Sequence, residues 1–121
     1  MWVFTQNGFY SVVAYDPARD HGGGPPGEDL LLVRARVRED LELLRRWIPS
    51  LEIREHGRAD YRFRTVMSRE QWKQILGAEV DYLDYTNFKN RVAEKQGHER
   101  HEAYMRVWSA MRRLQPSGTG G

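Results

Sequence analysis

The chain has 121 residues, of which 40% are hydrophobic and 30% charged, a composition typical of one globular domain with a modest core. It contains no cysteine, which excludes disulfides, thiolate metal sites and cysteine nucleophiles. A formal net charge of +2 does not by itself indicate nucleic-acid binding. No stretch is apolar enough for a membrane span and no signal-peptide pattern opens the chain, so we expect a cytoplasmic protein without a membrane partner.

The first predicted elements are two strands, residues 2–6 and 9–15, around the dipeptide Asn7-Gly8. This dipeptide is typical of type I′ hairpin turns, because both central positions of such a turn need positive φ. A two-residue loop would pair Phe4 with Ser11. Both faces of the ribbon are largely apolar, so we expect it inside the structure rather than at a bare edge.

Two segments rich in glycine and proline predict irregular structure: a flexible hairpin loop over residues 16–29 and a disordered tail over residues 116–121. Between them, residues 30–37 alternate cleanly and predict a third strand. Residues 51–56 and 60–67 predict two more strands, the second with apolar residues alternating against arginine.

Helical patterns occupy the rest of the chain. A stripe at helical spacing predicts a helix that Pro49 ends, and its members are Val37, Leu41, Leu44 and Ile48. Ser68 stands three residues before Gln71, the spacing of a capping box, and predicts the start of a second helix. Residues 88–114 hold two apolar stripes on nearly opposite sides of any continuous helix, which predicts two helices broken at Gly97.

The element order ββ, loop, β, α, ββ, α, α, α offers few parallel crossovers. We therefore expect one α+β domain over residues 1–115, with an antiparallel sheet of about five strands and helices mainly on one face. A ferredoxin-like variation is one topology of this kind.

The strongest candidate site is a set of four arginines on two predicted strands: Arg34, Arg36, Arg62 and Arg64. On one sheet face they could bind phosphates with a bidentate geometry that lysine lacks. The favoured interpretation is instead an exposed face kept soluble by charged side chains that pair with carboxylates. The candidate partners are Glu39, Glu52 and Asp60. Sheets that bind RNA also use stacking aromatics, for which the sequence offers Tyr10 and Tyr15.

A second candidate is a polar surface site in and before the stretch DYTNFKN, residues 84–90. Its hydrogen-bonding residues are Tyr82, Tyr85, Asn87 and Lys89. The favoured interpretation is a helix start, in which Asp84 or Thr86 caps the helix and Phe88 opens its buried stripe.

Metal and catalytic patterns are weak. His98 and His101 are three apart, whereas a zincin helix needs histidines four apart. His98 and Glu102 have the spacing to share a metal, but His101 falls on an apolar stripe and is interpreted as a histidine at the core edge. Aspartates near element ends usually cap or turn, and these are Asp60, Asp81 and Asp84. We therefore assign no catalytic residue, no metal site and no cofactor.

Five stretches, GFYSVV, LLVRAR, ADYRFR, DYxNFKNxV and YxRVWSAM, together resemble a family of small uncharacterised bacterial proteins. The resemblance covers most of residues 2–114 and implies a compact bacterial cytoplasmic domain. It implies no activity.

These patterns favour a non-enzymatic binding or adaptor module that presents the arginine-bearing face to a nucleic acid or an acidic protein. One alternative is a small phosphate-directed enzyme of the nuclease or phosphodiesterase type. The other is a homo-oligomeric subunit, a homodimer for example, that associates through some of its tryptophans. These tryptophans are Trp2, Trp47, Trp72 and Trp108.

Overall fold

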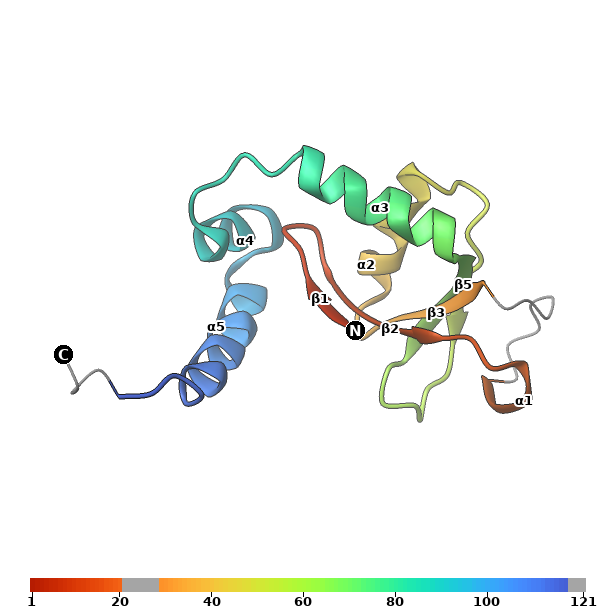
Figure 1. Cartoon of the computed structure of the whole chain (residues 1–121), viewed down its shortest axis with the longest axis horizontal. Helices are drawn as coiled ribbons and strands as arrows, with labels where there is room; N and C mark the ends of the chain where they lie inside the picture. The colour runs from red at the N-terminus through yellow and green to blue at the C-terminus, as the bar shows by residue number, and fades with distance from the viewer. Residues whose placement is uncertain (21–28, 118–121) are drawn as a thin grey trace. The chain divides into compact units, whose positions relative to one another are not determined.

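The computed structural model of the protein describes residues 1–20 and 29–117. The chain divides into two compact units, one from Met1 to Leu83 and one from Asp84 onward. Unit 1 contains a five-stranded antiparallel sheet with helices, and unit 2 contains two helices (Figure 1). The α+β class is confirmed, while the expectation of a single domain over residues 1–115 stays a prediction.

The strands, all in unit 1, are β1 (Trp2–Phe4), β2 (Phe9–Ala14), β3 (Leu30–Ala35), β4 (Arg54–Glu55) and β5 (Phe63–Ser68). The helices of unit 1 are α1 (Pro17–Asp20), α2 (Arg38–Glu42), the 3-10 helix η1 (Leu43–Arg46) and α3 (Arg69–Asp81). Those of unit 2 are α4 (Phe88–Gln96) and α5 (His98–Arg112). None of the described helices is long and apolar enough to cross a membrane.

The sheet has the order β1-β2-β3-β5-β4, and all four pairings are antiparallel. β5 lies between β3 and β4, which α2 and η1 connect, so these three strands form a split β-α-β unit. Ferredoxin-like folds contain the same unit. In this chain the strand on the other side of β3 is β2, which comes earlier in the sequence, and the ferredoxin-like variation stays a prediction.

The first hairpin has a longer turn than the Asn7-Gly8 dipeptide predicts. Phe4 lies opposite Phe9, so the expected pairing of Phe4 with Ser11 is wrong by two residues. Thr5 closes a four-residue turn, because its Oγ1 accepts the backbone N–H groups of Asn7 (3.1 Å) and Gly8 (3.0 Å). Its own N–H donates to the Gly8 carbonyl at 2.8 Å. β1 is an edge strand rather than an interior one.

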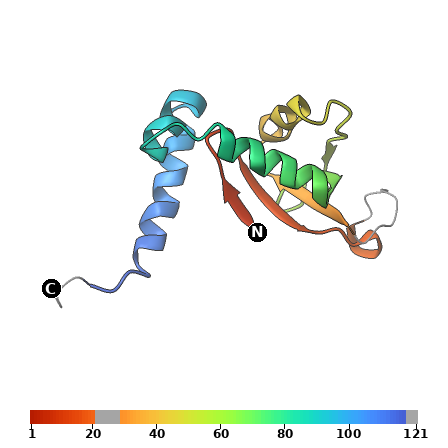
Figure 2. The same ribbon diagram turned by 45° about the horizontal axis from the view of Figure 1, so that its top comes forward.

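α2 and α3 lie on the same side of the sheet, packed on β3 and β5 (Figures 1 and 2). The core between these layers takes the alternate residues of the strands that face the helices, as the sequence pattern predicts. Its strand members include Tyr10, Val12, Leu31, Val33, Ala35 and Met67. Its helical members include Leu41, Leu44, Trp72 and Ile75. Of the predicted stripe that ends at Pro49, Leu41, Leu44 and Ile48 are buried and Val37 is half-buried, although the chain there forms two short helices rather than one.

The segment expected as a flexible loop, residues 16–29, begins with the short helix α1. Asp16 starts this helix, because its Oδ1 accepts the N–H of Ala18 at 3.0 Å. Residues 21–28 of the expected loop lie outside the described residues, as do residues 118–121 of the expected tail.

α3 begins as the sequence predicts. Ser68 Oγ accepts the N–H of Gln71 at 3.1 Å, and Gln71 Oε1 accepts the N–H of Ser68 at 2.8 Å. Both bonds of a capping box are therefore present. The end of the helix is tied to the first turn, since Asn7 Nδ2 donates to Glu79 Oε1 at 2.8 Å.

Unit 2 is an α4–α5 pair broken at Gly97, as predicted from its two apolar stripes. Gly97 has φ 88° and ψ 174°, a backbone conformation that glycine adopts and other residues avoid. The Phe88 and Tyr104 rings stack at 6.1 Å, joining the two helices. Val92 is fully buried.

Candidate nucleic-acid interface

α2 and α3 leave one face of the sheet uncovered. Cross-strand register places one side chain from every strand in a single row on this face. The row is Trp2, Ser11, Arg34, Arg64 and Arg54. With the neighbouring side chains it forms what we call the arginine–aromatic face, defined by Trp2, Phe4, Phe9, Arg34, Arg36, Tyr61, Arg62 and Arg64.

One end of this face is aromatic. The Phe4 and Phe9 rings stack at 4.4 Å, and Trp2 meets the edge of Phe9 at 6.3 Å. Trp2 is 69% exposed, while Phe4 and Phe9 are half-buried. The ribbon of β1 and β2 therefore presents one exposed indole on a base of two packed phenyl rings.

Tyr61 joins the aromatic end to the arginines. Its ring meets Phe9 at 6.4 Å, and the guanidinium carbons of Arg34 and Arg36 lie 4.7 Å and 4.5 Å from its centre. The ring was expected on the apolar side of its strand. Tyr61 precedes the first residue of β5, so its side chain does not follow the alternation of that strand.

Arg34 and Arg36 differ in how firmly they are held. Arg34 is half-buried, and its Nη2 donates to Ser11 Oγ at 2.8 Å. Arg36 is exposed, and its Nη1 donates to the Asp60 carbonyl oxygen (3.1 Å) and to Oδ1 of the same residue (3.3 Å). The first guanidinium is fixed on the sheet, whereas the second remains accessible to solvent.

Arg62 and Arg64 lie on or beside β5. Arg62 pairs with Glu55 of β4 through Nη2 at 2.7 Å and Nε at 2.8 Å, and the side chain is 57% exposed. Arg64 is half-buried, with Nη2 donating to the Tyr61 carbonyl at 3.3 Å. Two of the four arginines expected to form a site, Arg36 and Arg62, therefore form ion pairs with carboxylates. Both of those pairs are exposed.

The two tyrosines that the sequence offered for base stacking, Tyr10 and Tyr15, are both buried. Tyr10 and Tyr15 are 1% and 8% exposed, so neither can stack on a base. Tyr10 points into the core, where its Oη donates to the Asp40 carbonyl at 2.8 Å. The exposed ring on this face is that of Trp2. The alternation of Trp2 and Phe9 with core residues was visible in the sequence, but only the hairpin register shows that they share a face with Arg34.

Two members of the predicted polar surface site have structural roles at the start of α4. Asn87, not Asp84 or Thr86, caps the helix, because its Oδ1 accepts the N–H of Asn90 at 3.0 Å. Lys89 Nζ lies 5.1 Å from the centre of the Trp108 ring. Asp84 instead accepts a hydrogen bond from Arg91 Nη1 at 2.8 Å.

The other two members of that polar set belong to different units. Tyr85 packs near Phe88, with ring centres 5.9 Å apart, in unit 2. Tyr82 lies in unit 1, where it follows α3 and is 70% exposed. Its carbonyl accepts from Gln6 Nε2 at 3.4 Å. The set is therefore accounted for mainly by helix starts and ends.

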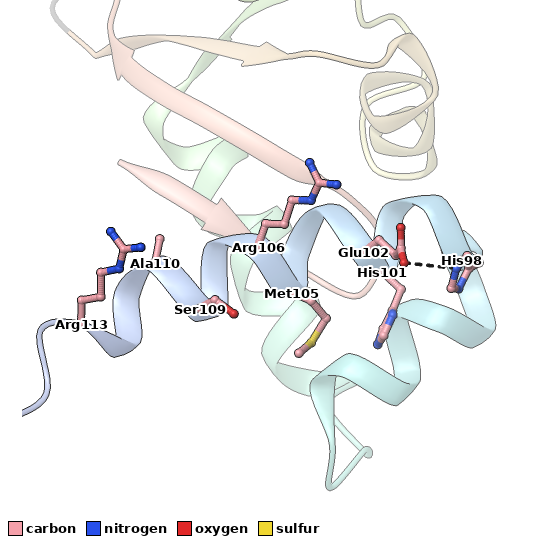
Figure 3. A pocket seen from close by; sticks show the side chains of 8 residues that line it. All are labelled: His98, His101, Glu102, Met105, Arg106, Ser109, Ala110 and Arg113. Carbon is pink, nitrogen blue, oxygen red and sulfur yellow. Dashed lines mark ion pairs between the residues drawn. The ribbon is translucent and has the colours of Figure 1, made fainter. Parts of the chain in front are cut away.

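The histidines of α5 lie along a shallow hollow of about 490 Å³ whose lining residues all come from that helix and the residue after it (Figure 3). His98 Nε2 lies 3.5 Å from Glu102 Oε1, and both side chains are largely exposed. His101 is half-buried, and its ring lies 6.4 Å from that of His98. In the described parts of the chain, no three His, Cys, Asp or Glu residues come together in a group that could hold a metal.

The four tryptophans divide evenly between core and surface. Trp72 is buried and Trp47 is half-buried, so both contribute to the core of unit 1. Trp2 is 69% and Trp108 46% exposed. Only these two have enough open surface to meet a partner.

Comparison of the chain with protein-family models, with curated proteins and with solved structures gave no match. The resemblance to small bacterial proteins therefore stays a prediction.

Proposed function

We propose that the protein is a non-enzymatic module that binds single-stranded nucleic acid on the arginine–aromatic face. The observation that carries the proposal is an exposed ring, Trp2, in one cross-strand row with Arg34 and Arg64. Single strands are bound by such combinations, because unpaired bases stack on aromatic side chains while arginine pairs with the phosphates.

The spacing of the two kinds of side chain suits one short strand. Trp2 and Arg34 stand on strands separated by one intervening strand, which corresponds to about 10 Å between their backbones. A base on the indole therefore leaves its neighbouring phosphates within reach of the arginines. In a duplex the bases are already stacked on each other, so the Trp2 ring cannot add a stacking contact that would favour binding.

The ion pairs on this face do not prevent its arginines from binding phosphate. The pairs Arg36–Asp60 and Arg62–Glu55 have exposed partners, and exposed pairs contribute only ~0–1 kcal/mol. A phosphate oxygen can replace such a carboxylate at low cost. Arg34 is already oriented by Ser11 and by the Tyr61 ring, so little side-chain entropy is lost when it binds.

The test is fluorescence anisotropy with labelled single-stranded RNA and DNA, and with duplexes of equal length, at two salt concentrations. We expect the single strands to bind more tightly than the duplexes. Trp2→Ala should weaken binding about tenfold or more at an unchanged salt slope, because base stacking contributes ~1–3 kcal/mol. Arg34→Ala/Arg36→Ala should weaken binding and lower the salt slope by about 1.4, because each arginine that binds a phosphate of a single strand contributes about 0.7 to the slope.

A control variant, Arg106→Ala/Arg113→Ala, removes two positive charges that are not part of the face. It should change affinity far less than the pair on β3. Equal affinity for duplex and single strand, with no effect of Trp2→Ala, would refute the base-stacking site. If polyglutamate binds with the same affinity as RNA and competes with it, the partner is an acidic protein instead.

A further inference from the structure

Unit 1 contains a second hollow, of about 350 Å³, between α3 and the sheet. Its apolar walls include Val12 of β2, Leu31 of β3 and Leu76 of α3. It lies on the helix-covered side of the sheet, so it is distinct from the arginine–aromatic face. We call it the α3 groove. Its volume is in the range of small-molecule sites, which are mostly apolar with a few polar groups.

One residue that lines the groove, Trp72, has a buried and unsatisfied hydrogen-bond donor. Trp72 is 4% exposed, and the indole Nε1–H is buried without a hydrogen-bond partner among the described residues. The ring is held by the edge contact with Tyr10 at 5.8 Å. The indole N–H is closed to solvent, so the ring can report on a chain bound in the groove without anchoring it.

Two cations stand on the helical side of the same groove. Arg69 and Lys73 both line it, are exposed, and are four residues apart, which puts them on one face of α3. Their carboxylate partners hold them weakly. Arg69 is 3.9 Å from Asp29 and Lys73 is 3.3 Å from Glu70, and both pairs are exposed.

We propose that the α3 groove binds an acyl chain of medium length that ends in a carboxylate. The apolar walls take the chain, and Arg69 and Lys73 attract the negative head group. A neutral amphiphile would leave the cations unused, and a cationic one would be repelled by them.

The experiment is a titration of the full-length protein with decanoate below its micelle concentration, followed by the ¹H–¹⁵N cross-peak of the Trp72 indole. We expect a saturable shift of this peak, while the indoles of Trp2 and Trp108 stay unchanged. Decanol should bind more weakly, and decyltrimethylammonium should not shift the Trp72 peak.

The variant Arg69→Gln/Lys73→Gln changes exposed side chains only, so the fold should survive. It should weaken decanoate binding about three- to tenfold and leave decanol binding unchanged, as the removal of two exposed charges predicts. Arg58→Gln/Lys95→Gln removes the same charge elsewhere and should leave decanoate binding unchanged.

Three results would overturn the proposal. One is the absence of a saturable shift at Trp72, and another is a shift that appears only once micelles form. The third is equal affinity for decanoate and decanol with no effect of the double variant, which would show an apolar hollow without a carboxylate site. None of these results depends on nucleic-acid binding, so the two proposals fail separately.

Discussion

Gly8 stands where the turn between β1 and β2 meets α2, and neighbouring atoms already occupy the place of a side chain. A Cβ at this position would lie 2.8 Å from both Asp40 Cγ and Tyr10 Oη. Neither neighbour can move easily. Asp40 is 3% exposed and its Oδ2 accepts the N–H of Phe9 at 3.1 Å, while Tyr10 Oη donates to the Asp40 carbonyl.

We therefore expect Gly8→Ala to lower the free energy of unfolding by ~1–3 kcal/mol, the usual cost of overpacking a rigid site. Urea denaturation followed by circular dichroism measures the change. Gly57→Ala is the matched control in another turn, where an added Cβ meets nothing within 4 Å, so its effect should stay within about 0.5 kcal/mol. A Gly8→Ala protein as stable as the wild type would show that the turn can shift.

The same turn shows why residue-level patterns mislead. Asn7-Gly8 predicts a two-residue turn by its own preferences, but Thr5 offers the backbone a competing set of hydrogen bonds. Asn7 also donates a hydrogen bond to Glu79 on α3, a partner 72 residues away in sequence. No local pattern contains that information.

At the scale of elements, the break between α4 and α5 depends on one backbone conformation. Among the glycines that the structure describes, Gly97 alone has a positive φ. Its φ and ψ of 88° and 174° lie in a region that almost only glycine occupies. Nothing lies within 4 Å of an added Cβ, so a substitution there tests backbone strain without steric overlap.

We expect Gly97→Ala to destabilise the α4–α5 pair by ~1–3 kcal/mol. Hydrogen exchange of the unit 2 amides measures this, because it reports local opening separately from global unfolding. Gly77→Ala inside α3 has equal space and ordinary helical dihedrals, so it should instead stabilise by ~0.5–1 kcal/mol. Unchanged exchange in Gly97→Ala would contradict the strain argument.

Helix boundaries that depend on residues close together in the sequence were predicted correctly. The capping box of Ser68 and Gln71 needs only residues three apart, and the break at Gly97 follows from the angle between two stripes. β4 was predicted over residues 51–56 but spans only Arg54–Glu55. Its length is decided by pairing with β5, which the sequence of β4 does not specify.

At the scale of the whole molecule, the hydrophobic core of unit 1 is built entirely before residue 84. We expect residues 1–83 by themselves to retain the sheet, with a cooperative urea transition and near-ultraviolet circular dichroism from packed aromatics. Residues 1–67 are the control. They lack α3 and with it Trp72 and Ile75, so they should fail to fold. A fragment 1–83 without a cooperative transition would show that its core depends on later residues.

The candidate site was only half visible from the sequence. The alternation of Arg34 and Arg36 with apolar residues predicted an arginine-bearing sheet face, and β3 and β5 do place Arg34 opposite Arg64. The aromatic half was missed because Trp2 and Phe9 join that face only through the register of a different hairpin.

The sequence by itself determined the α+β class, the alternation that buries one side of each strand, the start of α3 and the break at Gly97. Each follows from spacing or from the conformational preference of a few neighbouring residues. The tertiary structure alone decided the strand order, the position of β1 at the edge, and the partners of Thr5, Asn7 and Tyr61. These depend on contacts between segments that are distant in the chain, and the local sequence of each segment does not record which other segment it will meet.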